Sequence, residues 1–89
     1  MKIGVVGLGN RIAHVFYELK KINNKAELVA YVDPQPIGKN YAIKNNFFPT
    51  KNYLTLGEMI SNESLDLLMI GSPNHLHLEH IKEGLNAGL

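Results

Sequence analysis

Two kinds of apolar pattern alternate along the chain. Continuous apolar runs of about four to eight residues are typical of strands buried on both faces, whereas spacings of i, i+3, i+4 and i+7 predict amphipathic helices. Strand-like runs cover residues 2–6, 26–32 and 66–71, and a weaker run at 47–49 is interrupted by its proline. Each run is followed by a segment that favours a helix.

The first predicted helix begins at Asn10 and ends before Asn23, and its apolar stripe consists of Ile12, Val15, Phe16, Leu19 and Ile22. A second helix is expected over residues 38–47. The last is expected over residues 75–87, with an apolar stripe formed by Leu78, Ile81 and Leu85. Gly88 stands where a C-terminal glycine is favoured.

A shorter helix is predicted between the last two strand-like runs. Thr55 is a favourable N-cap, and Glu58 follows at the spacing of a capping box. Leu56, Met59 and Ile60 then provide one apolar face.

This strict alternation of strand and helix predicts an α/β fold, a three-layer doubly wound parallel sheet of about four strands. Leu89 lies where a further strand is expected, so residues 1–89 are interpreted as part of a larger domain. An incomplete sheet of this kind would leave one strand edge unpaired, and self-association or a homo-oligomer is therefore expected.

Composition removes several classes of function. Nine basic and eight acidic residues are scattered along the chain and give a net charge of +1, which does not favour nucleic-acid binding. The absence of cysteine excludes disulfides and thiolate chemistry. The apolar run at residues 3–8 is too short for a signal peptide or a membrane span, so a cytoplasmic protein is expected.

The first strand-like run leads into Gly7-Leu8-Gly9, a spacing that suits a tight turn before a helix. Such a turn brings backbone amides and the positive end of a helix dipole to a phosphate group. The predicted pyrophosphate site is formed by Gly7 and by the amides of Leu8, Gly9, Asn10, Arg11 and Ile12.

Two features of this glycine motif leave alternatives open. The third small residue of the pattern Gly-x-Gly-x-x-Gly/Ala is replaced by Ile12, although Ala13 follows directly. The Arg11 side chain could contact a phosphate or remain solvated. A glycine-rich turn that binds no ligand is the simpler alternative.

Asp33 ends the second strand-like run and is followed by proline. An aspartate in this position either caps a turn or accepts hydrogen bonds from the adenosine ribose hydroxyls of a dinucleotide. A carboxylate would repel a 2′-phosphate, so NAD is favoured over NADP. Lys39 is near enough in sequence to keep NADP open.

The clustered histidines His75, His77 and His80 do not predict a metal site, because His75 would be rotated away from the face that the other two share. No arrangement of serine, histidine and aspartate favours a hydrolase.

One segment resembles a known family. The run Asp66-Leu67-Leu68-Met69-Ile70-Gly71-Ser72-Pro73-Asn74-His75-Leu76-His77, with Ala87-Gly88 after it, resembles the fourth-strand motif of the Gfo/Idh/MocA oxidoreductases. Together with the glycine motif and Asp33, the resemblance covers the whole chain. It implies a Rossmann-type NAD(P)-binding domain, in which Ser72, Pro73 and Asn74 line the nicotinamide side and His77 lies beside them.

The resemblance also implies an activity, the oxidation of a secondary alcohol of a sugar, cyclitol or polyol by hydride transfer to the cofactor. In this family a catalytic lysine in a Glu-Lys-Pro sequence and an α+β substrate domain follow, and both would lie beyond Leu89. The 89 residues are therefore expected to be inactive as a dehydrogenase by themselves. The alternatives are a non-catalytic dinucleotide-binding regulatory module and an interaction fragment that binds no small molecule.

Overall fold

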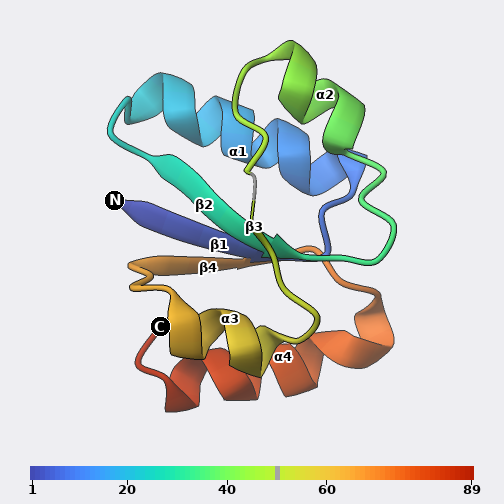
Figure 1. The fold of residues 1–89 in the computed structure, drawn as a ribbon, viewed down its shortest axis with the longest axis vertical. Coiled ribbons are helices and arrows are strands. Elements are labelled where there is room, and N and C mark those ends of the chain that lie inside the picture. Colours follow the sequence, from blue (N-terminus) through green and yellow to red (C-terminus); the bar gives the residue numbers. More distant parts are fainter. Residues whose placement is uncertain (50) are drawn as a thin grey trace.

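A parallel sheet lies between two layers of helices in the computed structural model, which describes residues 1–49 and 51–89 but not the side chains of residues 74 and 75 (Figure 1). The described strands are β1 (Lys2–Val6), β2 (Glu27–Val32), β3 (Lys51–Asn52) and β4 (Leu67–Ile70). The described helices are α1 (Asn10–Ile22), α2 (Lys39–Lys44), α3 (Leu56–Asn62) and α4 (Asn74–Asn86).

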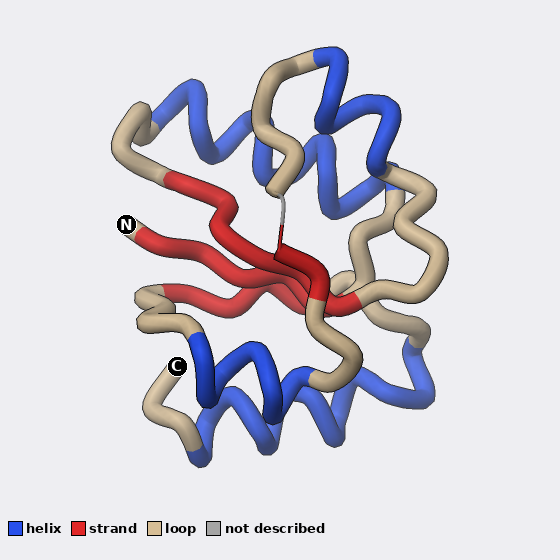
Figure 2. The backbone as a smooth tube through the Cα atoms, viewed as in Figure 1, coloured by secondary structure: helices blue, strands red, loops and turns tan. Residues whose placement is uncertain are grey.

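The strand order is β3-β2-β1-β4, and all three strand pairs are parallel. Helices α1 and α2 cover one face of the sheet, and α3 and α4 cover the other (Figures 1 and 2). This arrangement confirms the predicted α/β doubly wound fold. Within the described chain, β4 is an edge strand that pairs only with β1.

Apolar side chains fill the space on both faces of the sheet. Toward α1 and α2, the fully buried Ile3, Val5 and Leu8 pack with Phe16 and Phe47. Toward α3 and α4, a smaller cluster contains Ala30, Leu56 and Met59. Burial on both faces explains why β1 and β2 appear in the sequence as continuous apolar runs.

The predicted strand at residues 47–49 is wrong. No strand is assigned there, and the third strand is β3, two residues further along. Pro49 cannot donate a hydrogen bond to a sheet. The aromatic rings of Phe47 and Phe48 instead pack against Phe16 and Tyr31, respectively, so these apolar residues serve the core outside the sheet.

The second helix is shorter than the predicted 38–47. It stops because Asn46 adopts a left-handed conformation with φ of 61°, which asparagine tolerates better than most residues. The amide of Phe47 then donates to the carbonyl of Ala42 at 2.9 Å and closes the end of the helix.

The predicted apolar stripe of α1 is only partly correct. Phe16 is buried and Ile12 and Leu19 pack against the core, but Val15 is 49% exposed and Ile22 is 86% exposed. Ala13, which the stripe omitted, is fully buried. The buried face is therefore rotated toward a small residue that lets α1 approach its neighbours closely.

The apolar stripe predicted on α4 lies on an exposed face of the helix. Leu78, Ile81 and Leu85 are 65%, 44% and 66% exposed. The side of α4 that faces the sheet includes Gly84, where an added Cβ would lie 3.1 Å from the Leu68 side chain. Helical spacing identifies an apolar face but not the element that covers it, and the described residues leave this face open.

Both predicted helix caps are confirmed. The Thr55 hydroxyl accepts a hydrogen bond from the amide of Glu58 at 3.1 Å, and Glu58 in turn accepts one from the amide of Leu54. Gly88 has φ of 85°, and the amide of Leu89 donates to the carbonyl of Gly84 in a Schellman arrangement.

Among the described helices, none has the length and apolar character needed to cross a bilayer.

Candidate functional site

The turn between β1 and α1 depends on Gly7. Its φ of 83° lies in the left-handed region, and a Cβ at this position would approach the Ser72 nitrogen to 2.4 Å. The Gly7 amide donates to the carbonyl of Val32 at 2.8 Å. The turn is thereby held against both neighbouring strands, and no side chain larger than that of glycine fits.

Asp33 fixes the same turn from the end of β2. Its Oδ2 accepts a hydrogen bond from the amide of Leu8 at 2.8 Å, and its Oδ1 accepts one from the amide of Gln35 at 2.8 Å. A carboxylate offers about four lone-pair positions, so these two bonds leave acceptor capacity on both oxygens. The two sequence interpretations of Asp33, turn cap and hydroxyl acceptor, are therefore compatible.

The N-terminus of α1 opens next to this carboxylate. Gly9 is the N-cap residue and provides no side-chain cap, and the first helical hydrogen bond runs from Ala13 to the Gly9 carbonyl at 3.1 Å. The amides of Asn10, Arg11 and Ile12 precede that bond and have no acceptor within the helix. The Leu8 amide, also predicted to bind the pyrophosphate, already donates to Asp33.

Ile12 replaces the expected small residue without displacing the helix, because Gly71 provides the space. A Cβ at Gly71 would lie 3.0 Å from the Cβ of Ile12 and 2.4 Å from the Gly7 carbonyl oxygen. The small residue that this contact requires is therefore supplied by the end of β4. The sequence signal was the glycine directly after the fourth apolar run.

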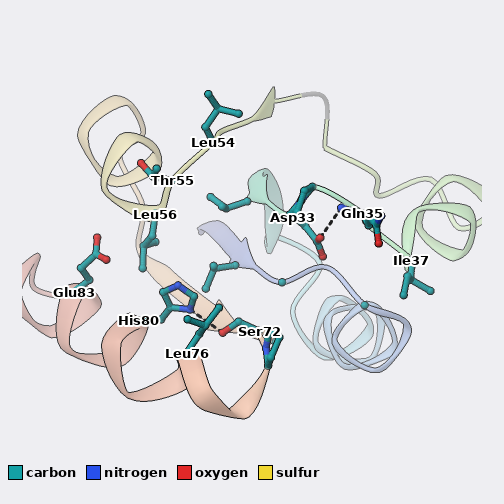
Figure 3. Close-up of a pocket in the computed structure, with 17 residues that line it drawn as sticks. Asp33, Gln35, Ile37, Leu54, Thr55, Leu56, Ser72, Leu76, His80 and Glu83 are labelled. Carbon is teal, nitrogen blue, oxygen red and sulfur yellow. Dashed lines mark hydrogen bonds between the residues drawn. The ribbon is translucent and has the colours of Figure 1, made fainter.

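A cleft of about 720 Å³ extends from the glycine turn across the ends of the strands (Figure 3). One side is formed by Asp33 and the residues after it, including Ile37, which is 69% exposed. The other side is formed by α4 and by the start of α3, where Leu54 is 86% exposed. This volume lies within the range of small-molecule sites, and the cleft occupies the position where open parallel sheets bind ligands.

The residues of the β4–α4 connection differ in their relation to this cleft. Ser72 and Pro73, both predicted to bind the cofactor, line it. The side chain of Asn74, predicted to bind the cofactor, lies outside the described residues. His77 is not among the residues that line the cleft, and its Nε2 is buried without a hydrogen-bond partner within the described part of the chain.

His80 lines the cleft in addition to the predicted residues. Its Nδ1 lies 2.7 Å from the Ser72 hydroxyl, a hydrogen-bonding distance (Figure 3). Leu76 and Glu83 line the cleft on the same helix. The spacing of i, i+4 and i+7 shared by these three residues was the available sequence signal, but it combines polar and apolar side chains and so does not form an apolar stripe. In the described residues, no group of three or more His, Asp or Glu has the arrangement of a metal site.

Comparison with known proteins identifies the class to which this fold and cleft belong. The model of the Gfo/Idh/MocA oxidoreductase family, described as an NAD-binding Rossmann fold, matches residues 1–89. The chain therefore belongs to this family, and the resemblance seen in its sequence is confirmed. No curated protein matches the chain significantly.

Solved structures agree with this assignment. A scyllo-inositol dehydrogenase from Lactobacillus casei, solved with NAD(H) and scyllo-inositol, is 31% identical with a TM-score of 0.75, and the match covers 99% of this chain. The WlbA dehydrogenase from Chromobacterium violaceum, solved with NADH and UDP-GlcNAcA, shares the fold with a TM-score of 0.79 and 24% identity over 100% of this chain. The chain spans about a quarter of the length of these structures, 26% and 25% respectively.

Proposed function

We propose that this chain binds NAD and forms the nucleotide-binding part of an oxidoreductase that acts on a secondary alcohol of a sugar, cyclitol or related polyol. The observation that carries the proposal is the placement of Asp33 beside the uncapped N-terminus of α1. A carboxylate suits the adenosine ribose hydroxyls, and a helix N-terminus suits the pyrophosphate. Family membership supports both assignments.

The residues of the cleft fit a dinucleotide. A Cβ at Gly9 would meet no atom within 4 Å, so the backbone at the start of α1 is open to a ligand. The amides of Asn10, Arg11 and Ile12 would donate to the pyrophosphate, and the exposed Arg11 would add a charge-assisted contact. The exposed apolar side chain of Leu54 would cover a base. When bound, the nicotinamide ring supplies a hydride acceptor, and the chain contributes the binding and orientation of that ring.

The β4–α4 connection is proposed to border the nicotinamide half. Ser72 and Pro73 follow the carboxyl end of β4, and Asn74 and His77 begin the next helix. These positions match the family motif that implied this role. The substrate class rests on relatives such as the scyllo-inositol dehydrogenase, and the expected catalytic lysine stays a prediction for sequence beyond Leu89.

Calorimetric titration of the 89-residue chain with NAD and with NADP tests the cofactor proposal. We expect NAD to bind more tightly, because the Asp33 carboxylate opposes a 2′-phosphate. A titration that shows no binding of either dinucleotide would refute the proposed function. Equal or tighter binding of NADP would refute the role assigned to Asp33 alone.

A further inference from the structure

Helix α4 presents two polar side chains to the cleft, opposite Asp33 (Figure 3). His80 and Glu83 are three positions apart, so they lie on the same side of the helix. Neither residue belongs to the motifs that indicated cofactor binding. Leu76, one turn earlier, adds an apolar surface to the same wall.

The imidazole of His80 is held in a fixed orientation. Its Nδ1 lies 2.7 Å from the hydroxyl of Ser72, and Ser72 is only 6% exposed. When the Ser72 hydroxyl donates to Nδ1, the neutral ring carries its proton on Nε2. The ring then offers one N–H donor on the atom that Ser72 does not occupy.

The carboxylate of Glu83 lies beside the first turn of α3. A Cβ added to Gly57 would be 3.5 Å from Glu83 Oε2, an ordinary contact distance, so the carboxylate lies directly against this turn. An ionised carboxylate accepts hydrogen bonds but donates none. His80 and Glu83 therefore place a donor and an acceptor on the same side of α4, about one helical turn apart.

The position of a bound base follows from the proposed function, on which this inference rests. With the pyrophosphate at the N-terminus of α1 and the ribose at Asp33, the base continues along the cleft away from the glycine turn. That part of the cleft is lined by the exposed Leu54, just before α3, and by His80 and Glu83 of α4.

We propose that Glu83 and His80 recognise the adenine base of the cofactor by its polar edge. Glu83 accepts a hydrogen bond from the exocyclic amine, and His80 Nε2–H donates one to N7, the ring nitrogen on the same edge of the base. Adenine presents this pairing of an amine donor with a nitrogen acceptor, whereas a 6-oxo purine presents an oxygen acceptor in place of the amine. Glu83 and His80 thus select adenine over hypoxanthine, and Ser72 positions the imidazole ring of His80.

Titration of the 89-residue chain with NAD and with nicotinamide hypoxanthine dinucleotide tests this proposal. We expect NAD to bind about tenfold more tightly, because the Glu83 carboxylate would face the 6-oxo oxygen without a donor. Equal affinity for the two dinucleotides would overturn the proposal while leaving the proposed function intact. If the chain binds neither, the proposed function fails and the inference fails with it.

Variants separate the two contacts. Glu83→Gln is expected to bring the two affinities within about twofold of each other, because an amide donates to an oxo group and still accepts from an amine. His80→Phe keeps an aromatic ring and is expected to weaken both dinucleotides equally, since both bases have an acceptor at N7. Glu79→Gln, on the same helix but outside the cleft lining, should leave both affinities unchanged.

The variants also define the results that count against the proposal. A Glu83→Gln protein that keeps the full preference for NAD would overturn the role of the carboxylate. His80→Asn, which retains a hydrogen-bonding atom near the position of Nδ1 but has no Nε2, would keep the contact with Ser72 alone. If His80→Asn binds both dinucleotides as the unmodified chain does, His80 serves only to hold the loop, and its proposed contact with the base is refuted.

Discussion

Asp33 Oδ2 accepts a hydrogen bond from the backbone amide of Leu8, 25 residues earlier, at 2.8 Å. This single contact joins the end of β2 to the turn between β1 and α1. The carboxylate that would bind the ribose therefore also holds the loop that would bind the pyrophosphate. A change at Asp33 should consequently affect both halves of the proposed site.

The substitution Asp33→Asn separates charge from shape. An amide can still accept from one backbone N–H, but it no longer repels a 2′-phosphate. We expect the affinity for NAD to fall and the ratio of NAD to NADP affinity to drop by about tenfold or more, since a like-charge contact costs several kcal/mol. Titration with both dinucleotides measures the ratio.

Asp66 provides a matched control for this variant. Its Oδ2 accepts from the amide of Lys2 at 2.7 Å, but it precedes β4, at the opposite end of the sheet from the cleft. Asp66→Asn should leave the ratio of the two affinities unchanged. If both variants change the ratio alike, a general loss of stability rather than the charge at Asp33 is responsible.

The packing of Gly71 against α1 leads to a second prediction. A Cβ at this position would lie 3.0 Å from the Ile12 Cβ and 2.4 Å from the Gly7 carbonyl oxygen. Gly71→Ala should therefore reduce the free energy of unfolding by about 1–3 kcal/mol, the range typical of overpacking. Urea denaturation followed by circular dichroism measures the loss.

A second variant identifies which contact matters. Shortening the neighbour with Ile12→Ala should fail to rescue Gly71→Ala, because the clash with the Gly7 backbone remains. Recovery of the stability in the double variant would mean that the backbone adjusts and that Ile12 alone sets the requirement for glycine.

The architecture could be predicted from the sequence further than the details of its faces. Burial on both sides makes the strands of a parallel sheet continuous apolar runs, so β1, β2 and β4 and the turns after them were visible. The third strand was predicted at the wrong residues, because Phe47 and Phe48 form an apolar run but pack in the core outside the sheet. The apolar stripe that includes Leu78 on α4 was predicted, but periodicity does not reveal what covers a helix.

The candidate site, too, could be predicted from the sequence only in part. Gly7, Gly9 and Asp33 are required by backbone geometry and by charge, and they stand at fixed places relative to the strands that precede them. The contact between Ser72 and His80 depends on how α4 is rotated over the end of β4, which sequence spacing alone does not give. The compensation of Ile12 by Gly71 likewise needs the distance between two elements that are far apart in the chain.

The cluster at the end of α3 gives a prediction on pH. The Tyr53 hydroxyl donates to Glu63, and Lys51 Nζ lies 3.4 Å from the same carboxylate. The hydrogen bond from Tyr53, aided by Lys51, holds the pKa of Glu63 below its ordinary value of 4.5, while the contact with Glu63 raises the pKa of Tyr53 above 10.0.

The sign of the effect follows from these directions. Because the Glu63 pKa is lower in the folded chain, its contribution to stability is present above pH 4.5 and is lost as the pH falls through the folded-state pKa. The Tyr53 contribution is present below pH 10.0 and is lost as the pH rises through its raised pKa. Urea denaturation at a series of pH values should show both losses.

Glu63→Gln should remove most of this dependence at the acidic end. Glu18→Gln is the control, since Glu18 pairs with Lys21 at 3.2 Å on an exposed surface. If the free energy of unfolding falls equally at acidic pH in Glu63→Gln and in the unmodified chain, Glu63 does not contribute to that loss.

The last prediction concerns the free edge of the sheet. Among the described residues, β4 pairs only with β1, and Leu67 at its start is 37% exposed. Beside this edge, α4 exposes the apolar side chains of Leu78, Ile81 and Leu85. An unpaired apolar edge recruits further strands, so we expect the 89-residue chain to self-associate as its concentration rises.

Sedimentation at several concentrations measures the association. Leu67→Lys should weaken it by about tenfold or more, because lysine on an edge strand opposes pairing with a second copy that carries the same charge, and tenfold corresponds to roughly 1.4 kcal/mol. Ile22→Lys, on the 86% exposed end of α1, should leave the association unchanged. A monomer at every concentration would show that the edge of β4 does not pair with a second copy.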